Sequence, residues 1–375
     1  MTTLRDFLEI PYDELEAMNL EAKNERLSRV SPDKIRDKRM KYLAEEKRIK
    51  AVTVCFTDLE GRMHMLDYDK KFLLKSADNL TFDGSSIRGF SAQAESDLRL
   101  AIDWPAFYWL PSDVFGPGKV LAFGEVLEKD GTPYVADLRA KLKAYLSKLY
   151  AKDGFVCNAA NEVEGFLFKG REAERHYHET GQFEFISTGG YYHALPTDPL
   201  RIFIDTAAEV QRAMGFANEK DHPEVAPSQF EMNYSYTEAS VAADQVQLYK
   251  LICRQVAAKL DMTASFLPKP VTGVNGSGMH TNLSISRPTD PAEAEAERVC
   301  HDAAARSGST PGRAGSTWTS TPSATTAKKS PSKSTTSPRV PSAPAPCSPS
   351  SLRTTPPPRW STPTPMSPRP NKHAR

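Results

Sequence analysis

The 375-residue chain has a net charge of +1, but that value averages two unlike parts. Residues 301–375 carry eleven Lys and Arg against one acidic residue, hold fifteen of the 29 prolines, and contain no Ile, Phe, Tyr or Glu, whereas residues 1–300 have a net charge of −9. The five cysteines are scattered without a CxxC pair, which indicates reduced thiols, and no apolar run approaches the roughly 20 residues that span a bilayer. We therefore expect a cytoplasmic protein with no membrane partner.

The first 66 residues favour helices followed by a hairpin. Residues 3–49 are polar and helical in character, with a start signal at Ser31-Pro32-Asp33, because serine caps helices and proline is favoured at the first helical position. Their apolar positions are sparse, so residues 1–50 are expected to be an extension on the surface or at an oligomer contact. Residues 51–66 place β-branched and aromatic residues around a turn at 58–61, which predicts two paired strands.

The next part of the chain mixes helices and strands, so the predicted class is α+β. Residues 133–154 are typical of an amphipathic helix that ends at Gly154, and residues 155–168 favour a strand. Residues 198–216 and 240–260 predict two further helices. The apolar face of the first helix is expected to consist of Leu138, Leu142, Tyr145, Leu146 and Leu149.

Two pairs of glutamates stand out. Glu162 and Glu164 lie two apart on a predicted strand, so both carboxylates should leave the same face while Val163 points away. Glu224 and Glu231 flank a Pro-Ser turn that can bring them together if both flanks are extended. Neighbouring like charges are costly unless a cation neutralises them. For either pair alone, a solvated face or an ordinary turn remains the commoner explanation.

A histidine follows the glycine-rich stretch "KPVTGVNGSGMHTNLSIS" at residues 269–286. His280 is more often structural in such a place, and His222 is expected to be a polar neighbour and not a ligand. Four carboxylates with one imidazole nevertheless suit Mg²⁺ or Mn²⁺ better than zinc, and this set has enough ligands for two such ions. Ions of this kind commonly hold phosphate oxygens during phosphoryl transfer.

Taken in order, the motifs closely resemble the glutamine synthetase family. They are "FDGSS" and "ESD" within residues 81–100, E-x-E at 162–164, "GGYY" at 189–192, "EVAPSQFE" at 224–231, "FLPKP" at 266–270 and "NGSGMH" at 275–280. The resemblance covers about residues 51–286. It implies a small β-grasp domain over residues 51–130 and a truncated catalytic domain over residues 131–290. It also implies a homo-oligomeric ring with active sites between subunits.

The resemblance also implies roles for individual residues. Glu164, Glu224 and Glu231 resemble ligands of the metal nearer glutamate, and Glu162 and His280 resemble ligands of the metal nearer the ATP phosphates. Asp83 resembles the acid that binds ammonium and takes its proton, and it acts in the neighbouring subunit's site. Glu219 and Ser284 match nucleotide-contacting positions, and Asn275 and Gly276 match glutamate-contacting positions. Taken alone, Asp83-Gly84-Ser85-Ser86 is also explained as a simple turn.

The activity implied is the ATP-dependent joining of ammonia to the γ-carboxylate of glutamate, through a γ-glutamyl phosphate, to give glutamine. The substrates would be ATP, glutamate and ammonia, with two Mg²⁺ or Mn²⁺ ions. A ligase that joins glutamate to another amine is an alternative, because only the acceptor pocket would differ. An inactive truncated subunit that associates with an intact synthetase is a second alternative.

The chain departs from the family pattern at two places. Ser228 stands where the family usually has glycine. After Arg287 we find no family motif, neither the arginines for phosphate and glutamate nor a further metal-binding glutamate. Residues 291–375 are predicted to be a disordered basic tail, because so few apolar residues cannot offset the ordering entropy. We interpret the change as a reading-frame shift near codons 287–300, which predicts impaired activity. A nucleic-acid partner is not expected, because only two tryptophans interrupt the tail's charge.

Overall fold

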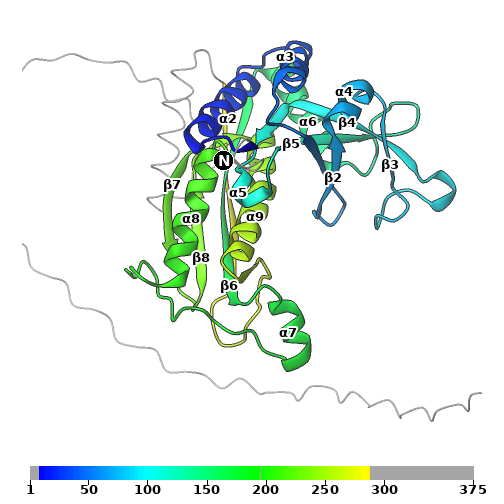
Figure 1. The fold of residues 1–375 in the computed structure, drawn as a ribbon. Coiled ribbons are helices and arrows are strands. Elements are labelled where there is room, and N and C mark those ends of the chain that lie inside the picture. The colour runs from blue at the N-terminus through cyan, green and yellow to red at the C-terminus, as the bar shows by residue number, and fades with distance from the viewer. Residues whose placement is uncertain (1–7, 195, 288–375) are drawn as a thin grey trace, which may run out of the picture. The chain divides into compact units, whose positions relative to one another are not determined.

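The computed structural model of the chain describes residues 8–194 and 196–287. Its fold belongs to the α+β class, with two separate β-sheets and helices packed against each (Figure 1). The sequence-based expectations for residues 291–375, including a disordered tail, lie outside the described residues. Among the described residues, no helix is long and apolar enough to cross a bilayer.

The N-terminal helices lie on the first sheet and contact it through a few buried side chains, and their expected place at an oligomer contact stays a prediction. Helices α2 (Tyr12–Leu27) and α3 (Pro32–Glu45) bury Leu15, Ile35 and Leu43 in one cluster with the first sheet. The side chain of Asn19 donates to the carbonyls of Trp109 and Ala213 and accepts from the amide of Trp109. The sparse apolar positions of these helices are therefore enough for an intramolecular contact. Helix α3 does begin at Pro32 as predicted, but Ser31 makes no side-chain capping bond.

The first sheet has the strand order β2-β1-β5-β4-β3. The predicted hairpin is confirmed as β1 (Ala51–Thr57) paired antiparallel with β2 (Met63–Asp69). Strand β5 (Lys119–Leu127) runs parallel to β1, and β4 (Asp97–Trp109) connects it to β3 (Leu80–Asp83) through antiparallel pairs. The short elements that lie between these strands are α4 (Lys70–Ser76), a 3₁₀ turn (Gln93–Glu95) and α5 (Ser112–Phe115).

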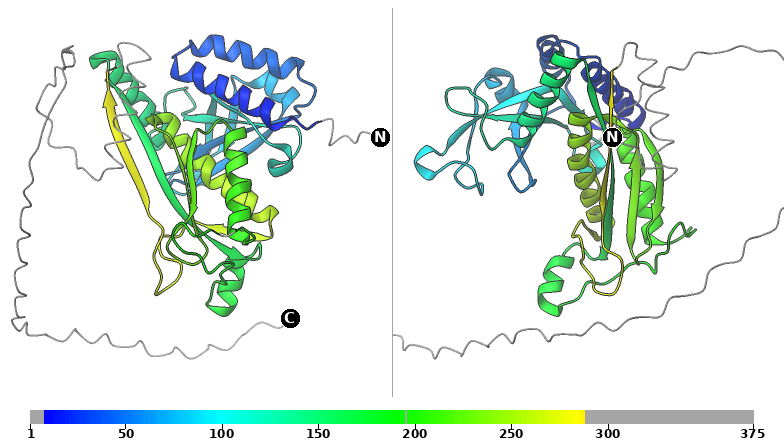
Figure 2. Two further views of the ribbon diagram at one scale, coloured as in Figure 1. Left: turned by 90° about the vertical axis from the view of Figure 1, so that its left-hand side faces the viewer. Right: turned by 180° about the vertical axis from the view of Figure 1, so that it is seen from behind.

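The second sheet is built around the long strand β6 (Val156–Lys169). Strand β10 (Met262–Ser265) and strand β8 (Gln229–Tyr234) pair with its C-terminal part, and β7 (Asn218–Pro223) lies beyond β8. Strand β9 (Thr237–Glu238) and strand β11 (Met279–Ser286) pair with its N-terminal part. Figure 2 shows β11, in yellow, running alongside β6.

Four helices accompany this sheet, and one of them overturns a prediction about its buried face. They are α6 (Leu138–Asp153), α7 (Ala173–Thr180), α8 (Pro199–Ala213) and α9 (Ala239–Lys259). Helix α6 ends at Gly154 as predicted, with φ +69°. Of the expected apolar face, Leu146 is buried as predicted, but Leu138 and Tyr145 are exposed, and the helix also buries Arg139. The burial of Arg139 is possible because carboxylates surround it.

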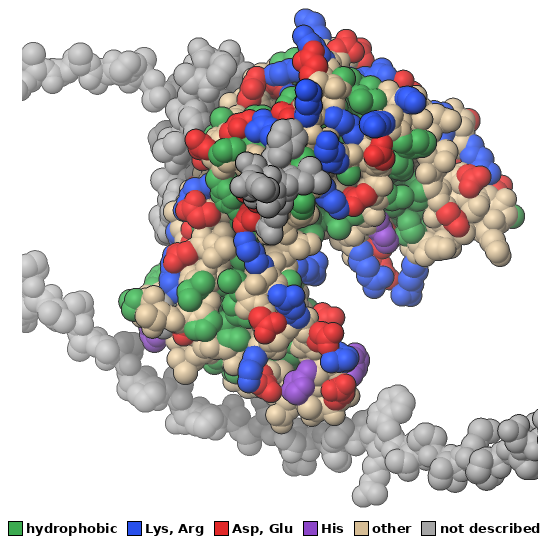
Figure 3. Space-filling model, viewed as in Figure 1, with side chains coloured by type: hydrophobic (Ala, Val, Ile, Leu, Met, Phe, Trp, Pro, Cys, Tyr) green, Lys and Arg blue, Asp and Glu red, His purple; other side chains and the backbone are tan. Residues whose placement is uncertain are grey.

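Those carboxylates belong to a buried ionic network that joins four elements. Arg139 on α6 bonds to Asp103 on β4 and to Asp244 on α9, and Arg26 on α2 bonds to Asp244. Lys143 completes the network on Asp103. Elsewhere, acidic and basic side chains are interspersed on the face shown in Figure 3, without a continuous region of one sign.

Candidate active site

Strand β6 presents its two glutamates to different neighbours on one face of the sheet. Val163, between them, is buried in the hydrophobic core on the opposite face, as the alternation of a strand requires. Glu162 lies opposite His280 of β11, and Glu164 lies opposite Glu231 of β8. The predicted common face of Glu162 and Glu164 is therefore confirmed.

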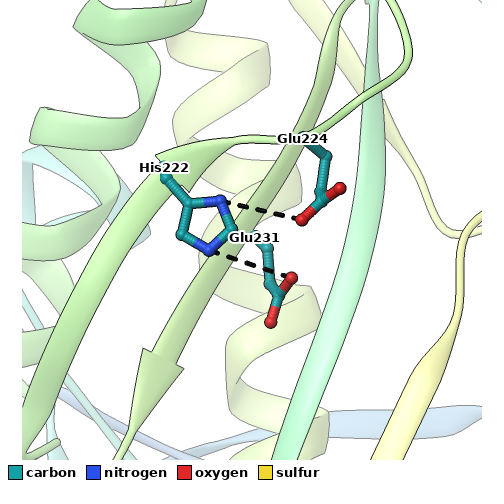
Figure 4. Close-up of side chains that lie close together, drawn as sticks. All are labelled: His222, Glu224 and Glu231. Carbon is teal, nitrogen blue, oxygen red and sulfur yellow. Dashed lines mark ion pairs between the residues drawn. The ribbon is translucent and has the colours of Figure 1, made fainter. Parts of the chain in front are cut away.

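The most closely gathered set of candidate ligands is His222, Glu224 and Glu231. One ligand atom from each lies within 4.8 Å of the others, and all three residues are buried. His222 Nδ1 is 3.7 Å from Glu224 Oε1, and Nε2 is 3.9 Å from Glu231 Oε2. Figure 4 shows the imidazole beside the two carboxylates, with one ring nitrogen toward Glu224 and the other toward Glu231. The prediction that the Pro-Ser turn brings Glu224 and Glu231 together is confirmed.

The electrostatics of this set favour an added positive charge. The pKa of Glu224 is raised to about 7, mainly by burial and then by the neighbouring Glu231 and Glu164 carboxylates, while the hydrogen bond from the Val225 amide lowers it. The raised pKa therefore means that ionising Glu224 is unfavourable unless a positive charge lies nearby.

Glu164 lies beside this set but has partners of its own. Its Oε2 atom accepts hydrogen bonds from Gln229 Nε2 and from the Gly278 amide, both at 3.0 Å. Gln229 Nε2 also donates to the carbonyl of Gly276 at 3.0 Å. Gly276 has no room for a side chain, because a Cβ there would lie 2.4 Å from the Pro268 carbonyl oxygen. The glycine-rich loop is thus held against the carboxylates.

Glu162 and His280 form a second, more open pair. His280 Nδ1 lies 3.5 Å from Glu162 Oε2, and Asn282 donates to the other carboxylate oxygen. The His280 side chain is 70% exposed, unlike the buried His222. Among residues 8–194 and 196–287, no third Asp, Glu, Cys or His joins this pair within ligand distance.

The other expected site residues lie on separate parts of the fold. Glu219 is on β7 and accepts a hydrogen bond from Ser235, Ser284 is buried on β11, and Asn275 is exposed in the loop before β11. Asp83 ends β3 in the other sheet, where its carboxylate accepts from the amide and hydroxyl of Ser85. Those bonds lower the pKa of Asp83.

An aromatic loop covers the imidazole of His222. The rings of Tyr191 and Tyr192 lie edge-on to it, with centroids at 5.6 and 4.6 Å. Ser228 holds the start of this loop: its hydroxyl accepts from the amides of Ile186 and Ser187 at 2.8 and 3.0 Å. Ser228 itself has φ +60°, in the left-handed region where glycine is favoured. The serine therefore has a local function that glycine could not supply.

The residues present fit a divalent cation at the buried set. The Nε2 atom of His222 is buried and has no hydrogen-bond partner, although it faces a carboxylate. Buried polar atoms are rarely left in this state, so a cation between the two groups is a natural partner. The expectation that His222 is a polar neighbour and not a ligand stays a prediction, but the structure places the imidazole in direct reach of both carboxylates. A usable signal was its spacing two residues before Glu224, the same strand periodicity that identified Glu162 and Glu164.

Comparison with known proteins agrees with the motifs. The family model described as "Glutamine synthetase, beta-Grasp domain" matches residues 48–128, and that described as "Glutamine synthetase, catalytic domain" matches residues 135–305. The chain belongs to the glutamine synthetase family. The catalytic-domain match runs on past Arg287, which corrects the expectation that the likeness ends there. It stops at residue 305, well before the end of the chain.

The chain matches individual members of the family over part of their length. Glutamine synthetases of Staphylococcus epidermidis and Staphylococcus aureus are each 37% identical over 254 residues, which is 66% of this chain and 54% of theirs. The chain therefore spans about half the length of these curated relatives.

Solved structures agree on the fold. A cryo-EM structure of Plasmodium falciparum glutamine synthetase has a TM-score of 0.58 at 21% identity, covering 68% of this chain and 56% of that one. A structure of GmaS with ADP has a TM-score of 0.56 at 26% identity, covering 66% and 55%.

Proposed function

We propose that the chain is a ligase that joins ammonia to the γ-carboxylate of glutamate at the expense of ATP, through a γ-glutamyl phosphate. The observation that carries this proposal is the carboxylate face of β6 and β8, where Glu231, Glu224 and Glu164 gather beside the pair Glu162–His280. Family membership supports the reaction class. The ADP in the GmaS structure supports a nucleotide as the second substrate.

Two groups of residues would hold divalent cations. Glu224 and Glu231, with Glu164 beside them, would hold one Mg²⁺ or Mn²⁺, and Glu162 with His280 would hold the other. Bound cations of this kind neutralise phosphate charge and so favour phosphoryl transfer between two anions. Gln229 positions the Glu164 carboxylate, and Asn233 positions one oxygen of Glu231 at 2.7 Å.

The remaining residues bind and orient the substrates. Asn275 and Gly276 would contact glutamate, since the loop that carries them is held beside the carboxylates by Gln229. Glu219 and Ser284 would contact the nucleotide. Asp83 would bind ammonium, because hydrogen bonds from Ser85 favour its ionised form. The family resemblance also gives Asp83 the role of accepting the ammonium proton. Asp83 lies on the other sheet, so we propose that it serves a second copy of the chain in a homo-oligomeric ring.

The test is glutamine formation by the full chain from ATP, glutamate and ammonium with Mg²⁺ or Mn²⁺. Because the chain spans about half the length of the curated relatives it matches, we expect it to form glutamine far more slowly than those relatives do. The product should disappear in Glu231→Gln, whereas Glu209→Gln, on the exposed side of α8, should match the parent. Methylamine offered in place of ammonium tests the amine-ligase alternative. The proposal is contradicted if nucleotide affinity is the same with and without divalent cations and is also unchanged in Glu231→Gln.

The covered length favours one second candidate, a truncated subunit that associates with an intact synthetase. Adding the chain to an active family member and measuring both activity and mass of the assembly tests it. Co-assembly together with no glutamine formed by the chain alone would favour this candidate over the ligase.

A further inference from the structure

The imidazole of His222 lies beside the carboxylates of Glu224 and Glu231, and other contacts fix its orientation. Its Nδ1 atom lies 3.1 Å from the Pro223 carbonyl oxygen. A carbonyl only accepts, so this contact requires the proton on Nδ1. The edges of the Tyr191 and Tyr192 rings pack against the same imidazole. The ring is thereby held in one tautomer and in one place.

In a neutral imidazole, a proton on Nδ1 leaves a lone pair on Nε2. The Nε2 atom is buried and without a hydrogen-bond partner, and Glu231 Oε2 lies 3.9 Å from it. Two electron-pair donors therefore face each other across a gap with no proton between them. That arrangement is unfavourable in a buried site unless a cation lies between them.

The two carboxylates are prepared in the same way. Glu224 Oε2 accepts from the Val225 amide at 2.9 Å, and Glu231 Oε1 accepts from Asn233 at 2.7 Å. In each case the other oxygen is the one turned toward the imidazole. Bonds of this kind orient metal ligands, and a backbone carbonyl on the far nitrogen does the same for a ligating histidine.

We infer that His222 Nε2 is a direct ligand of the cation held by Glu224 and Glu231, so that this site selects a divalent transition metal over Mg²⁺. Imidazole nitrogen binds the later first-row divalent metals strongly, whereas Mg²⁺ prefers oxygen ligands. The inference rests on the proposed function only in requiring a cation at these carboxylates. It needs neither ATP nor glutamate.

The experiment measures metal binding to the full chain without substrates. It is made in a His280→Asn background, so that the exposed imidazole of the second pair contributes no nitrogen. Pulsed EPR of bound Mn²⁺ should show coupling to one imidazole nitrogen, and Co²⁺ titration followed by its visible absorption gives the affinity. If this protein, in which His222 is intact, shows no nitrogen coupling, the inference is wrong.

Substitution then assigns the nitrogen. His222→Gln should remove the coupling and weaken Co²⁺ binding about 10- to 100-fold, with a much smaller change for Mg²⁺. His193→Gln is the matched control, because His193 lies in the same aromatic loop and its Nδ1 is 3.1 Å from the Gly189 carbonyl oxygen. This variant should bind both metals like its parent. Equal losses for Co²⁺ and Mg²⁺ in His222→Gln would show a purely structural histidine and would overturn the inference. Since no step needs turnover, absence of glutamine synthesis counts only against the proposed function.

Discussion

Arg139 and Asp244 form a two-point ion pair in the protein interior, with Nε to Oδ1 at 2.7 Å and Nη2 to Oδ2 at 2.8 Å. The pair joins α6 to α9, and α9 enters the sequence directly after β9, which pairs with β6. Arg26 and Asp103 extend it to α2 and β4. The ion pairs thus fix α9, and α9 packs against β6, the strand that carries Glu162 and Glu164.

Removing one charge from this network should destabilise the fold strongly. In Asp244→Asn, Arg139 and Arg26 lose a buried counter-charge, and breaking a buried pair in this way costs about 3–5 kcal/mol. Asp205→Asn is the control, because Asp205 pairs with Arg201 on the exposed side of α8, where a pair contributes at most about 1 kcal/mol. Urea unfolding of both variants measures the free energies. Equal losses in the two variants would contradict a structural role for the buried network.

The same network predicts the response to acid. Burial by itself would raise the pKa of Asp103 and of Asp244, but the surrounding Arg139, Arg26 and Lys143 outweigh it and hold both below the ordinary value. A carboxylate with a lowered folded pKa stabilises the fold above its unfolded pKa, near 3.9, and this stabilisation is lost as the pH falls further. Unfolding free energy should therefore drop below about pH 4. The drop should be smaller in Asp103→Asn, and an identical acid slope in that variant would count against this assignment.

Local periodicity predicted the parts of the site that depend on one strand or one turn. Glu162 and Glu164 share a face because side chains alternate along β6, and Glu224 approaches Glu231 because both flanks of the turn are extended. These relationships need no knowledge of distant packing. They were predictable from residues a few positions apart.

Features that depend on distant partners were not predictable in this way. Leu138 and Tyr145 form an apolar stripe on α6, yet the helix packs through Arg139, since the partners of Arg139 come from β4 and α9. The partners of α2 were hidden for the same reason, because Asn19 bonds to residues near positions 109 and 213. The unpaired Nε2 atom of His222 was also not predictable, because no sequence pattern reveals whether a buried nitrogen has a hydrogen-bond partner.

The close approach of the aromatic loop to the carboxylate turn predicts a strong effect at Gly189. It has φ +66°, and a Cβ there would lie 2.7 Å from the Ala226 carbonyl oxygen and 2.8 Å from Pro227 Cα. Gly181 also has a positive φ, +74°, but an added Cβ would meet nothing within 4 Å. In both alanine variants the left-handed backbone should lower the free energy of unfolding by about 1 kcal/mol or more. In Gly189→Ala the steric overlap should lower it by roughly 1–3 kcal/mol more.

Thermal and urea unfolding of the two glycine variants measure this difference. Cobalt binding adds a second measurement, because a displaced loop would release Tyr191 and Tyr192 from the imidazole of His222. Gly189→Ala should weaken Co²⁺ binding, and Gly181→Ala should not. If the two variants unfold alike, the loop does not lie as close to the turn as the structure shows.

Ser228 has two opposing effects on stability: its hydroxyl makes favourable hydrogen bonds, and its backbone conformation is unfavourable. Its hydroxyl accepts from the amides of Ile186 and Ser187, and its backbone has φ +60°. Ser228→Ala keeps the unfavourable backbone and leaves the buried amide of Ser187 and the half-buried amide of Ile186 without an acceptor. A buried group in that state costs about 1–3 kcal/mol. Ser228→Gly loses the same hydrogen bonds but relieves the backbone, which is worth about 1 kcal/mol. We therefore expect both variants to be less stable than the parent, with glycine above alanine in urea unfolding. A glycine variant as stable as the parent would mean that water replaces the hydroxyl, and the serine would then contribute nothing to holding the aromatic loop.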